Sequence, residues 1–147
     1  MASDIKQKAG SSQTLEASGA SVSNGAVGTA NDADLDNTTA LGFSWSFVLN
    51  GGFGSSVTAG EDLDLYLVPK IDGTNAADAD TSTPVFQPSH YRGTFITPTT
   101  GTSARRMTVE GVVLGPYKYV GYVHNKSGQT LSSGWALVGY PEIAQST

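Results

Sequence analysis

The stretch that decides the fold class is LGFSWSFVL, residues 41–49. Positions 42, 44 and 46 hold Gly or Ser, whereas every odd position holds a large apolar side chain: Leu41, Phe43, Trp45, Phe47 and Leu49. Successive side chains of a β-strand point to opposite faces. The alternation therefore predicts one long strand with one face in a core and the other outside it.

The same period of two returns further along the chain. Leu63, Leu65 and Leu67 alternate with aspartates at positions 62 and 64, which predicts a second strand over about residues 62–71. Shorter strands, separated by polar turns, are expected over residues 91–96, 107–114, 117–124 and 135–140. No stretch shows a helical period of comparable strength. The sequence thus predicts an all-β chain, folded as a β-sandwich or jelly-roll-like domain.

The first forty residues differ from the rest in composition. Large side chains are sparse from Met1 to about Thr39, among many Ala, Ser, Gly and Asn residues. Such a segment cannot offset its own ordering entropy by burial. We expect either a flexible arm or an extended strand that becomes ordered by docking on a neighbour. The expected organisation is an arm over residues 1–39 and a β-sandwich domain over residues 40–147.

The alternating positions also predict which side chains form the core. These are Leu41, Phe43, Trp45, Phe47, Leu63, Leu65, Leu67, Val109 and Trp135. Aromatic residues gather near the C-terminus, where they either pack in the core or form an exposed interface. The candidate interface residues are Leu15, Val22, Val27, Tyr117, Tyr119 and Tyr122.

Composition excludes several classes of function. The chain has 147 residues, a net charge of −5 and no cysteine. Nucleic-acid binding needs clustered positive charge, which is lacking, and disulfides, zinc–thiolate sites and thiol nucleophiles are impossible. The first residues lack the apolar run of a secretory signal, and no segment is long enough to span a bilayer. We expect a chain made in a cytoplasm, with neither nucleic acid nor membrane as partner.

One acidic stretch has the spacing of a calcium loop. Asp32, Asp34 and Asp36 lie at alternate positions, as oxygen ligands of such loops do. An EF-hand also needs Gly at its sixth position and Glu at its twelfth, where this chain has Asn37 and Phe43. We therefore favour a solvated turn and predict no metal site, although the spacing leaves ion binding open.

Catalytic motifs are not found. Neither His90 nor His124 lies at a spacing that favours a metal site, and no serine lies in a GxSxG elbow. No glycine-rich phosphate-binding motif is present either. We expect no enzymatic activity and no cofactor.

Several segments, taken in order, resemble small virion proteins of tailed bacteriophages. They are LDNTT at 35–39, LDLYLVPKIDG at 63–73, YRGTF at 91–95, VVLGPYKYVGYVHNKSGQTLSS at 112–133 and GYP at 139–141. The resemblance implies a capsid decoration, or cement, protein that binds the outer surface of a phage capsid and stabilises contacts between major capsid protein subunits. It further implies a homo-oligomer, a dimer or trimer, that resides on the virion and, during assembly, in the host cytoplasm.

The alternative interpretation is a carbohydrate- or receptor-binding β-sandwich module of a phage tail or fibre. It requires an exposed aromatic platform with polar or acidic side chains beside it. The candidates are Tyr91, Tyr117, Tyr119 and Tyr122, with Asp78 or Asp80. The sequence alone leaves open whether the protein belongs to a head or a tail.

Overall fold

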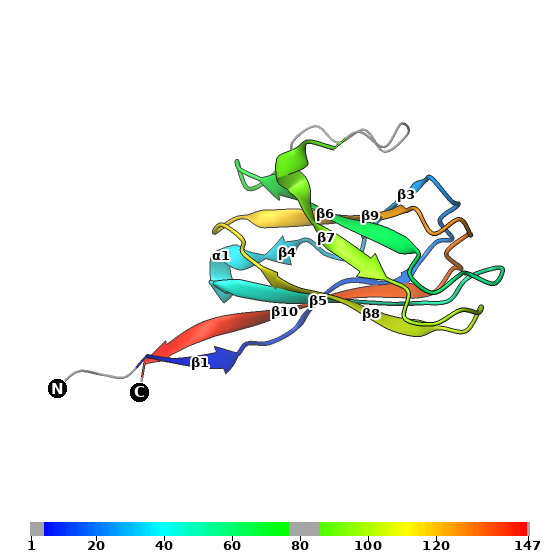
Figure 1. Cartoon of the computed structure of the whole chain (residues 1–147). Helices are drawn as coiled ribbons and strands as arrows, with labels where there is room; N and C mark the ends of the chain where they lie inside the picture. The colour runs from blue at the N-terminus through cyan, green and yellow to red at the C-terminus, as the bar shows by residue number, and fades with distance from the viewer. Residues whose placement is uncertain (1–4, 77–85, 147) are drawn as a thin grey trace.

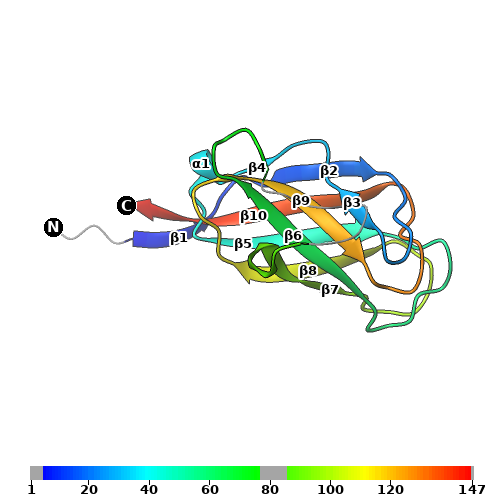
Figure 2. The same cartoon turned by 90° about the horizontal axis from the view of Figure 1, so that it is seen from above.

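Two antiparallel sheets lie face to face in the computed structural model, which describes residues 5–76 and 86–146 (Figures 1 and 2). The chain is therefore a β-sandwich, as the alternating sequence pattern predicts. The described residues form two short helical turns, α1 (Asn37–Ala40) and η1 (Pro88–His90). None of the described helices is long and apolar enough to cross a membrane.

Each sheet has five strands among the described residues. The first sheet has the order β1-β10-β5-β8, and β2 also pairs with β10. Its strands are β1 (Ile5–Ala9), β2 (Gln13–Gly19), β5 (Ser44–Gly51), β8 (Arg105–Val112) and β10 (Trp135–Ser146). The second has the order β3-β9-β6-β7, with β4 also on β9. Its strands are β3 (Val27–Thr29), β4 (Leu35–Asp36), β6 (Asp62–Lys70), β7 (Tyr91–Ile96) and β9 (Lys118–Asn125).

The core lies between the two sheets and is made by alternate side chains of their strands. Trp45 and Phe47 of β5 stack with their ring centroids 6.1 Å apart. Seven of the nine residues expected in the core are buried there: Trp45, Phe47, Leu63, Leu65, Leu67, Val109 and Trp135.

The other two expected core residues, Leu41 and Phe43, lie at the surface, 65% and 38% exposed. The prediction was wrong because β5 begins only at Ser44. Leu41 ends α1 in a left-handed conformation with φ of 47°, which interrupts any extended run. The turn itself is set by Asp36, whose carboxylate accepts hydrogen bonds from the backbone N–H groups at the start of α1.

The N-terminal segment also differs from the expected arm. Strands β2, β3 and β4 belong to the two sheets, and Leu15 and Val22, expected at an interface, are buried in the core. Val27 is partly exposed on β3. Glycine explains the misleading composition: a Cβ on Gly19 would lie 2.2 Å from Cε2 of Trp135. Small residues are thus needed where this segment packs closely on the core.

Within the described residues, β1 extends from the body of the molecule as an arm would. It pairs with the last part of β10, from Glu142 to Ser146, and the two strands project together from one end of the sandwich (Figures 1 and 2).

Candidate functional site

A groove of about 400 Å³ opens where β6 ends and β7 begins. Three stretches of the chain that lie apart in the sequence supply its lining. These are the end of β6 with Pro69 and Ile71, the continuous η1–β7 region with Gln87, Ser89, His90 and Arg92, and the entry to β9 with Gly115 and Tyr117 in the loop and Tyr119 in the strand.

The loop that forms one wall of the groove is fixed by Asn37. The side-chain amide of Asn37 is buried and donates a hydrogen bond to the carbonyl oxygen of Gly115 at 3.0 Å. Its backbone N–H donates to the carbonyl oxygen of Tyr117 at 3.1 Å. Tyr119 adds a bond from its own hydroxyl to the oxygen of Gly115 at 3.2 Å. The position of the Tyr117 ring therefore depends on a turn in the opposite half of the chain.

The opposite wall is shaped by a β-bulge in β7. Tyr91 pairs with Tyr66 and Gly93 with Leu65, so Arg92 has no partner residue on β6. Gly93 has a φ of 144°, and a Cβ there would lie 2.5 Å from Cγ1 of Val109. Only glycine fits that position, and the bulge it permits lets the side chain of Arg92 line the groove.

Two buried polar atoms of the groove residues lack hydrogen-bond partners among the described residues. They are Nδ1 of His90, a residue only 5% exposed, and Nε of Arg92. Burial, with the positive charge of Arg92 nearby, lowers the pKa of His90 and favours its neutral form. Buried polar groups in folded proteins are nearly always paired, because an unpaired one costs roughly 1–3 kcal/mol. Because both atoms are buried, they can pair with a ligand in the groove only through a bridging water or after a small shift of the side chain.

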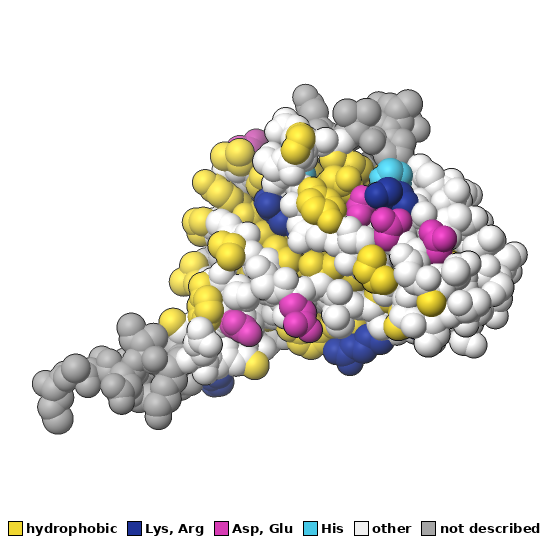
Figure 3. Space-filling view, viewed as in Figure 1, with side chains coloured by type: hydrophobic (Ala, Val, Ile, Leu, Met, Phe, Trp, Pro, Cys, Tyr) yellow, Lys and Arg dark blue, Asp and Glu magenta, His cyan; other side chains and the backbone are white. Residues whose placement is uncertain are grey.

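The groove also presents aromatic and apolar surface. Tyr117 is 38% exposed and packs edge-on against Tyr119, with the ring centroids 6.5 Å apart. Ile71, which is well exposed, adds an aliphatic side chain to the lining. Figure 3 shows hydrophobic side chains gathered along this flank of the molecule.

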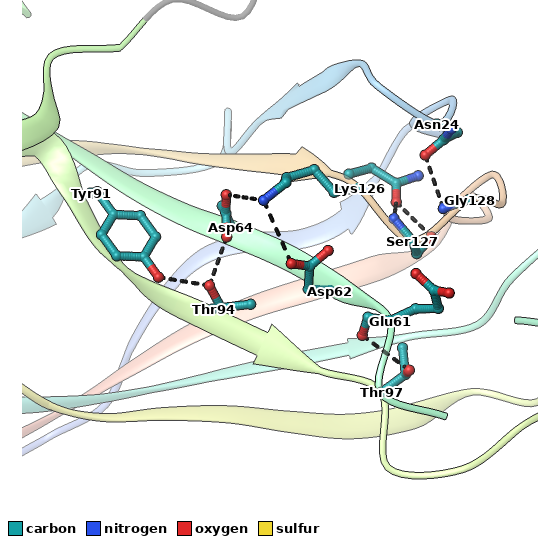
Figure 4. Close-up of polar contacts among 11 residues, drawn as sticks. Asn24, Glu61, Asp62, Asp64, Tyr91, Thr94, Thr97, Lys126, Ser127 and Gly128 are labelled. Atoms are coloured by element: carbon teal, nitrogen blue, oxygen red, sulfur yellow. Dashed lines mark hydrogen bonds and ion pairs between the residues drawn. The ribbon is translucent and has the colours of Figure 1, made fainter. Parts of the chain in front are cut away.

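A second group of aromatic and polar residues lies on the outer face of the second sheet (Figure 4). The hydroxyl of Tyr91 lies 2.7 Å from Oγ1 of Thr94, which in turn donates to Asp64 at 2.7 Å. Since Thr94 has one hydroxyl proton and gives it to Asp64, Tyr91 is the donor to Thr94. Lys126 binds the other oxygen of Asp64 at 3.1 Å. The polar groups of this network bond to one another, so few of their hydrogen-bonding positions are left for a ligand.

The rings on that face are likewise packed on one another. Tyr66 stacks on Phe86 with the centroids 4.2 Å apart, and Phe86 lies 5.3 Å from Tyr122. Tyr122 is largely buried as a result. The four tyrosines expected to form one platform are thus divided, with Tyr91 and Tyr122 on the sheet face and the other two at the groove. Asp78 and Asp80 lie outside the described residues.

The acidic stretch from Asp32 to Asp36 serves the fold. Asp32 accepts a hydrogen bond from the backbone N–H of Ala17 at 2.6 Å, and Asp34 pairs with Lys70 at 2.8 Å. Asp36 caps α1. The three carboxylates thus bind different partners, and within residues 5–76 and 86–146 no group of three potential metal ligands comes together.

The groove was not predicted from sequence, although Tyr117 and Tyr119 were candidate interface residues. Tyr117 is half-exposed, as an interface residue would be. Tyr119 is buried, and its hydroxyl is paired with the carbonyl oxygen of Gly115. His90 and Arg92 were missed as site residues. One signal was present, namely a glycine at position 93 inside a predicted strand, which is typical of a bulge.

No protein-family model matches the chain, and no curated protein matches it either. Among the solved structures that resemble it is the crystal structure of the CBM36-1 domain of a multidomain xylanase from the hindgut metagenome of Trinervitermes trinervoides. The TM-score is 0.48 with 14% sequence identity, over 93% of this chain and 96% of that one. A likeness at this level says nothing about a ligand. The resemblance to bacteriophage virion proteins is not tested by these comparisons and stays a prediction.

Proposed function

We propose that the protein is a non-catalytic carbohydrate-binding module that holds a saccharide in the groove between β6, η1, β7 and the loop into β9. The observation that carries this proposal is one concave site lined by the half-exposed ring of Tyr117 together with His90 and Arg92, whose buried Nδ1 and Nε have no hydrogen-bond partner among the described residues. Binding sites for small molecules commonly combine apolar surface with a few convergent polar groups in this way.

The chemistry of a sugar suits both parts of the groove. One face of a pyranose ring presents C–H groups, which pack on an aromatic ring, while its hydroxyls at the rim need hydrogen-bond partners. Tyr117 offers the ring, and Gln87, Ser89 and His90 offer polar side chains. A groove of about 400 Å³ lies within the range of ordinary ligand sites.

Binding rather than catalysis is proposed because the groove lacks a paired acid and base. No carboxylate occurs among its described lining residues. Glycoside cleavage ordinarily uses two carboxyl groups flanking the bond, and a serine nucleophile needs an oriented base. Ser89 and His90 have no acidic partner in the described lining to orient them.

The experiment is a glycan array probed with the purified chain, followed by calorimetric titration of any saccharide that binds. Tyr117→Ala should weaken binding at least tenfold, which corresponds to about 1.4 kcal/mol. Tyr140→Ala is the matched control, because Tyr140 is similarly exposed on β10 but does not line the groove. Unchanged affinity in Tyr117→Ala, or equal losses in both variants, would contradict the proposed site.

A second candidate function, capsid decoration, is favoured by a different observation. The β1–β10 projection extends from one end of the sandwich (Figure 1). At that end the backbone N–H of Phe43 donates a hydrogen bond to the backbone carbonyl oxygen of Glu142. Leu41, Phe43 and Val113 expose apolar surface near this end. A protruding strand and an apolar surface beside it suit assembly through strand addition to a neighbour, multiplied over a symmetric shell.

This candidate is tested by light scattering and by co-sedimentation with capsid shells that lack the protein. Gln7→Pro removes a backbone N–H from β1, where Gln7 pairs with Ala144, and should abolish a dimer or trimer built on this edge. Gln129→Ala, at a position outside both β1 and the groove, is the control. A monomer that does not bind shells would exclude capsid decoration.

A further inference from the structure

We infer that the saccharide bound in the groove carries a carboxylate, as uronic acids do, and that Arg92 is its ionic partner. This inference rests on the proposed carbohydrate-binding function and narrows the class of ligand.

The first observation is the local charge of the groove. The chain as a whole has a net charge of −5, with 13 acidic residues among 147. Among the described lining residues, however, Arg92 is the single side chain with a permanent charge. The described lining of the groove is therefore positively charged on an acidic protein. Acids that lie farther from the groove than the Debye length, about 8 Å at physiological salt, are largely screened.

The second observation is that Arg92 lacks an ionic partner in the described part of the chain. The ion pairs there join Lys70 to Asp34 and Lys126 to Asp62 and Asp64, and none includes Arg92. Its Nε is buried and makes no hydrogen bond to described atoms. Arginine side chains that are partly withdrawn from water usually pair with an anion, because charge-assisted hydrogen bonds offset the loss of hydration.

Asp72, the described acid that follows the groove residue Ile71 in the chain, does not supply that partner. Asp72, which lines the neighbouring hollow, accepts hydrogen bonds from the backbone N–H groups of Asn75 and Thr74. These bonds hold the pKa of its carboxyl at about 2. The carboxylate of Asp72 thus bonds within its own turn, and no carboxylate of the described residues forms an ion pair with Arg92.

The third observation is the combination of Arg92 with Tyr117 in one groove. The carboxylate of a hexuronic acid is attached at the edge of the pyranose ring, so the ring face can pack on Tyr117 while the carboxylate meets a cation. The planar guanidinium fork matches a planar carboxylate in a bidentate fashion. A sulfate ester offers the same negative charge in a tetrahedral arrangement, and the test must separate these two anions.

The test compares the affinity of the full chain for polygalacturonate, alginate, glucuronoxylan and hyaluronan with its affinity for the carboxyl-reduced form of each polymer. Dextran sulfate and dextran form a further pair. Isothermal titration should give at least tenfold tighter binding to one or more carboxylated polymers than to the reduced counterpart. Dextran sulfate should bind no better than dextran.

Variants at Arg92 assign the preference to its side chain. Arg92→Gln should lose the preference for carboxylate yet still bind the reduced polymer, whereas Arg92→Lys should retain part of it. Arg106→Gln, at an exposed position of β8 away from the groove, is the matched control and should keep the preference. Thermal unfolding of each variant checks that the fold is intact, and Arg92→Met, which also removes the charge, serves if Arg92→Gln fails to fold.

The possible failures are distinguishable. Equal affinity for carboxylated and reduced polymers, or a preference that survives both Arg92 variants, would overturn this inference and leave the proposed function standing. Tighter binding to dextran sulfate than to any uronate would assign the site to sulfated sugars and overturn it as well. Absence of binding to every polymer, charged or neutral, would contradict the proposed function itself.

Discussion

The amide nitrogen of Asn37 lies 3.0 Å from the carbonyl oxygen of Gly115, although 78 positions separate the two residues. The amide oxygen of the same side chain accepts hydrogen bonds from the backbone N–H of Gly42 at 2.8 Å and from Nε1 of Trp45 at 3.3 Å. One buried side chain thus joins the α1 turn, the core tryptophan and the loop that forms the groove wall.

Asn37→Ala should therefore destabilise the fold and the groove together. Removing the amide leaves buried partners unpaired, which should lower the free energy of unfolding by roughly 2–4 kcal/mol. Urea denaturation measures the change. Asn75→Ala, on an exposed turn, is the control and should change stability by less than about 0.5 kcal/mol. A similarly small loss in Asn37→Ala would contradict this role.

Leu15→Ala tests whether the N-terminal segment is part of the core. Leu15 is fully buried between the sheets, so truncation should cost roughly 2–5 kcal/mol. Leu41→Ala, at a largely exposed leucine, should cost less than about 0.5 kcal/mol. Equal and small effects of the two variants would instead support a segment that is not integrated into the sandwich.

Gly19→Ala tests the close approach of β2 to Trp135. The new Cβ would lie 2.2 Å from the indole ring, which must shift, at a cost of roughly 1–3 kcal/mol. Gly54→Ala is the matched substitution, because the nearest atom to its Cβ would be 3.8 Å away. Thermal unfolding should show a clear drop in Tm for the first variant only, and a similar Tm for both would argue against the packing described.

The stability of the protein should depend on pH through His90. Its folded-state pKa is lowered from 6.5 by burial and by Arg92, so the unfolded chain takes up a proton at a higher pH than the folded chain does. The free energy of unfolding should therefore fall as pH drops from about 6.5 toward the lowered folded value, and level off below it.

Chemical denaturation between pH 7.5 and pH 5 measures this dependence. His90→Gln should remove the part of the slope that His90 contributes, whereas His124→Gln should leave that part in place. An identical pH profile in the wild-type protein and His90→Gln would show that His90 is not held in its neutral form.

The strands that could be predicted are those with several alternating apolar side chains. Leu63, Leu65 and Leu67 define β6 with their period of two, and the leucines lie in the core as a strand of that pattern requires. Strands β3 and β4 are only 3 and 2 residues long and carry too few side chains to show a period. Glycines in the N-terminal segment, such as Gly19, pack closely on the core residue Trp135, and their abundance favours a flexible arm when only the sequence is considered.

The groove could not be predicted because tertiary structure assembles it. His90 and Arg92 lie close together in the chain, but Tyr117 is distant in sequence, and only the pairing of β6 with both β7 and β9 brings it to them. The bulge at Arg92 also shifts the alternation of side chains along β7. A prediction from strict alternation therefore assigns side chains on one side of the bulge to the wrong face of the sheet.

The most direct test of the central claim, that the groove binds a saccharide, is a titration followed by amide chemical shifts in NMR spectra of the isotope-labelled chain. The account predicts saturable shifts confined to the groove, at residues 71, 87–92 and 115–119, on addition of a saccharide that binds. Shifts confined to the β1–β10 projection, or no shift with any saccharide of the panel, would contradict it.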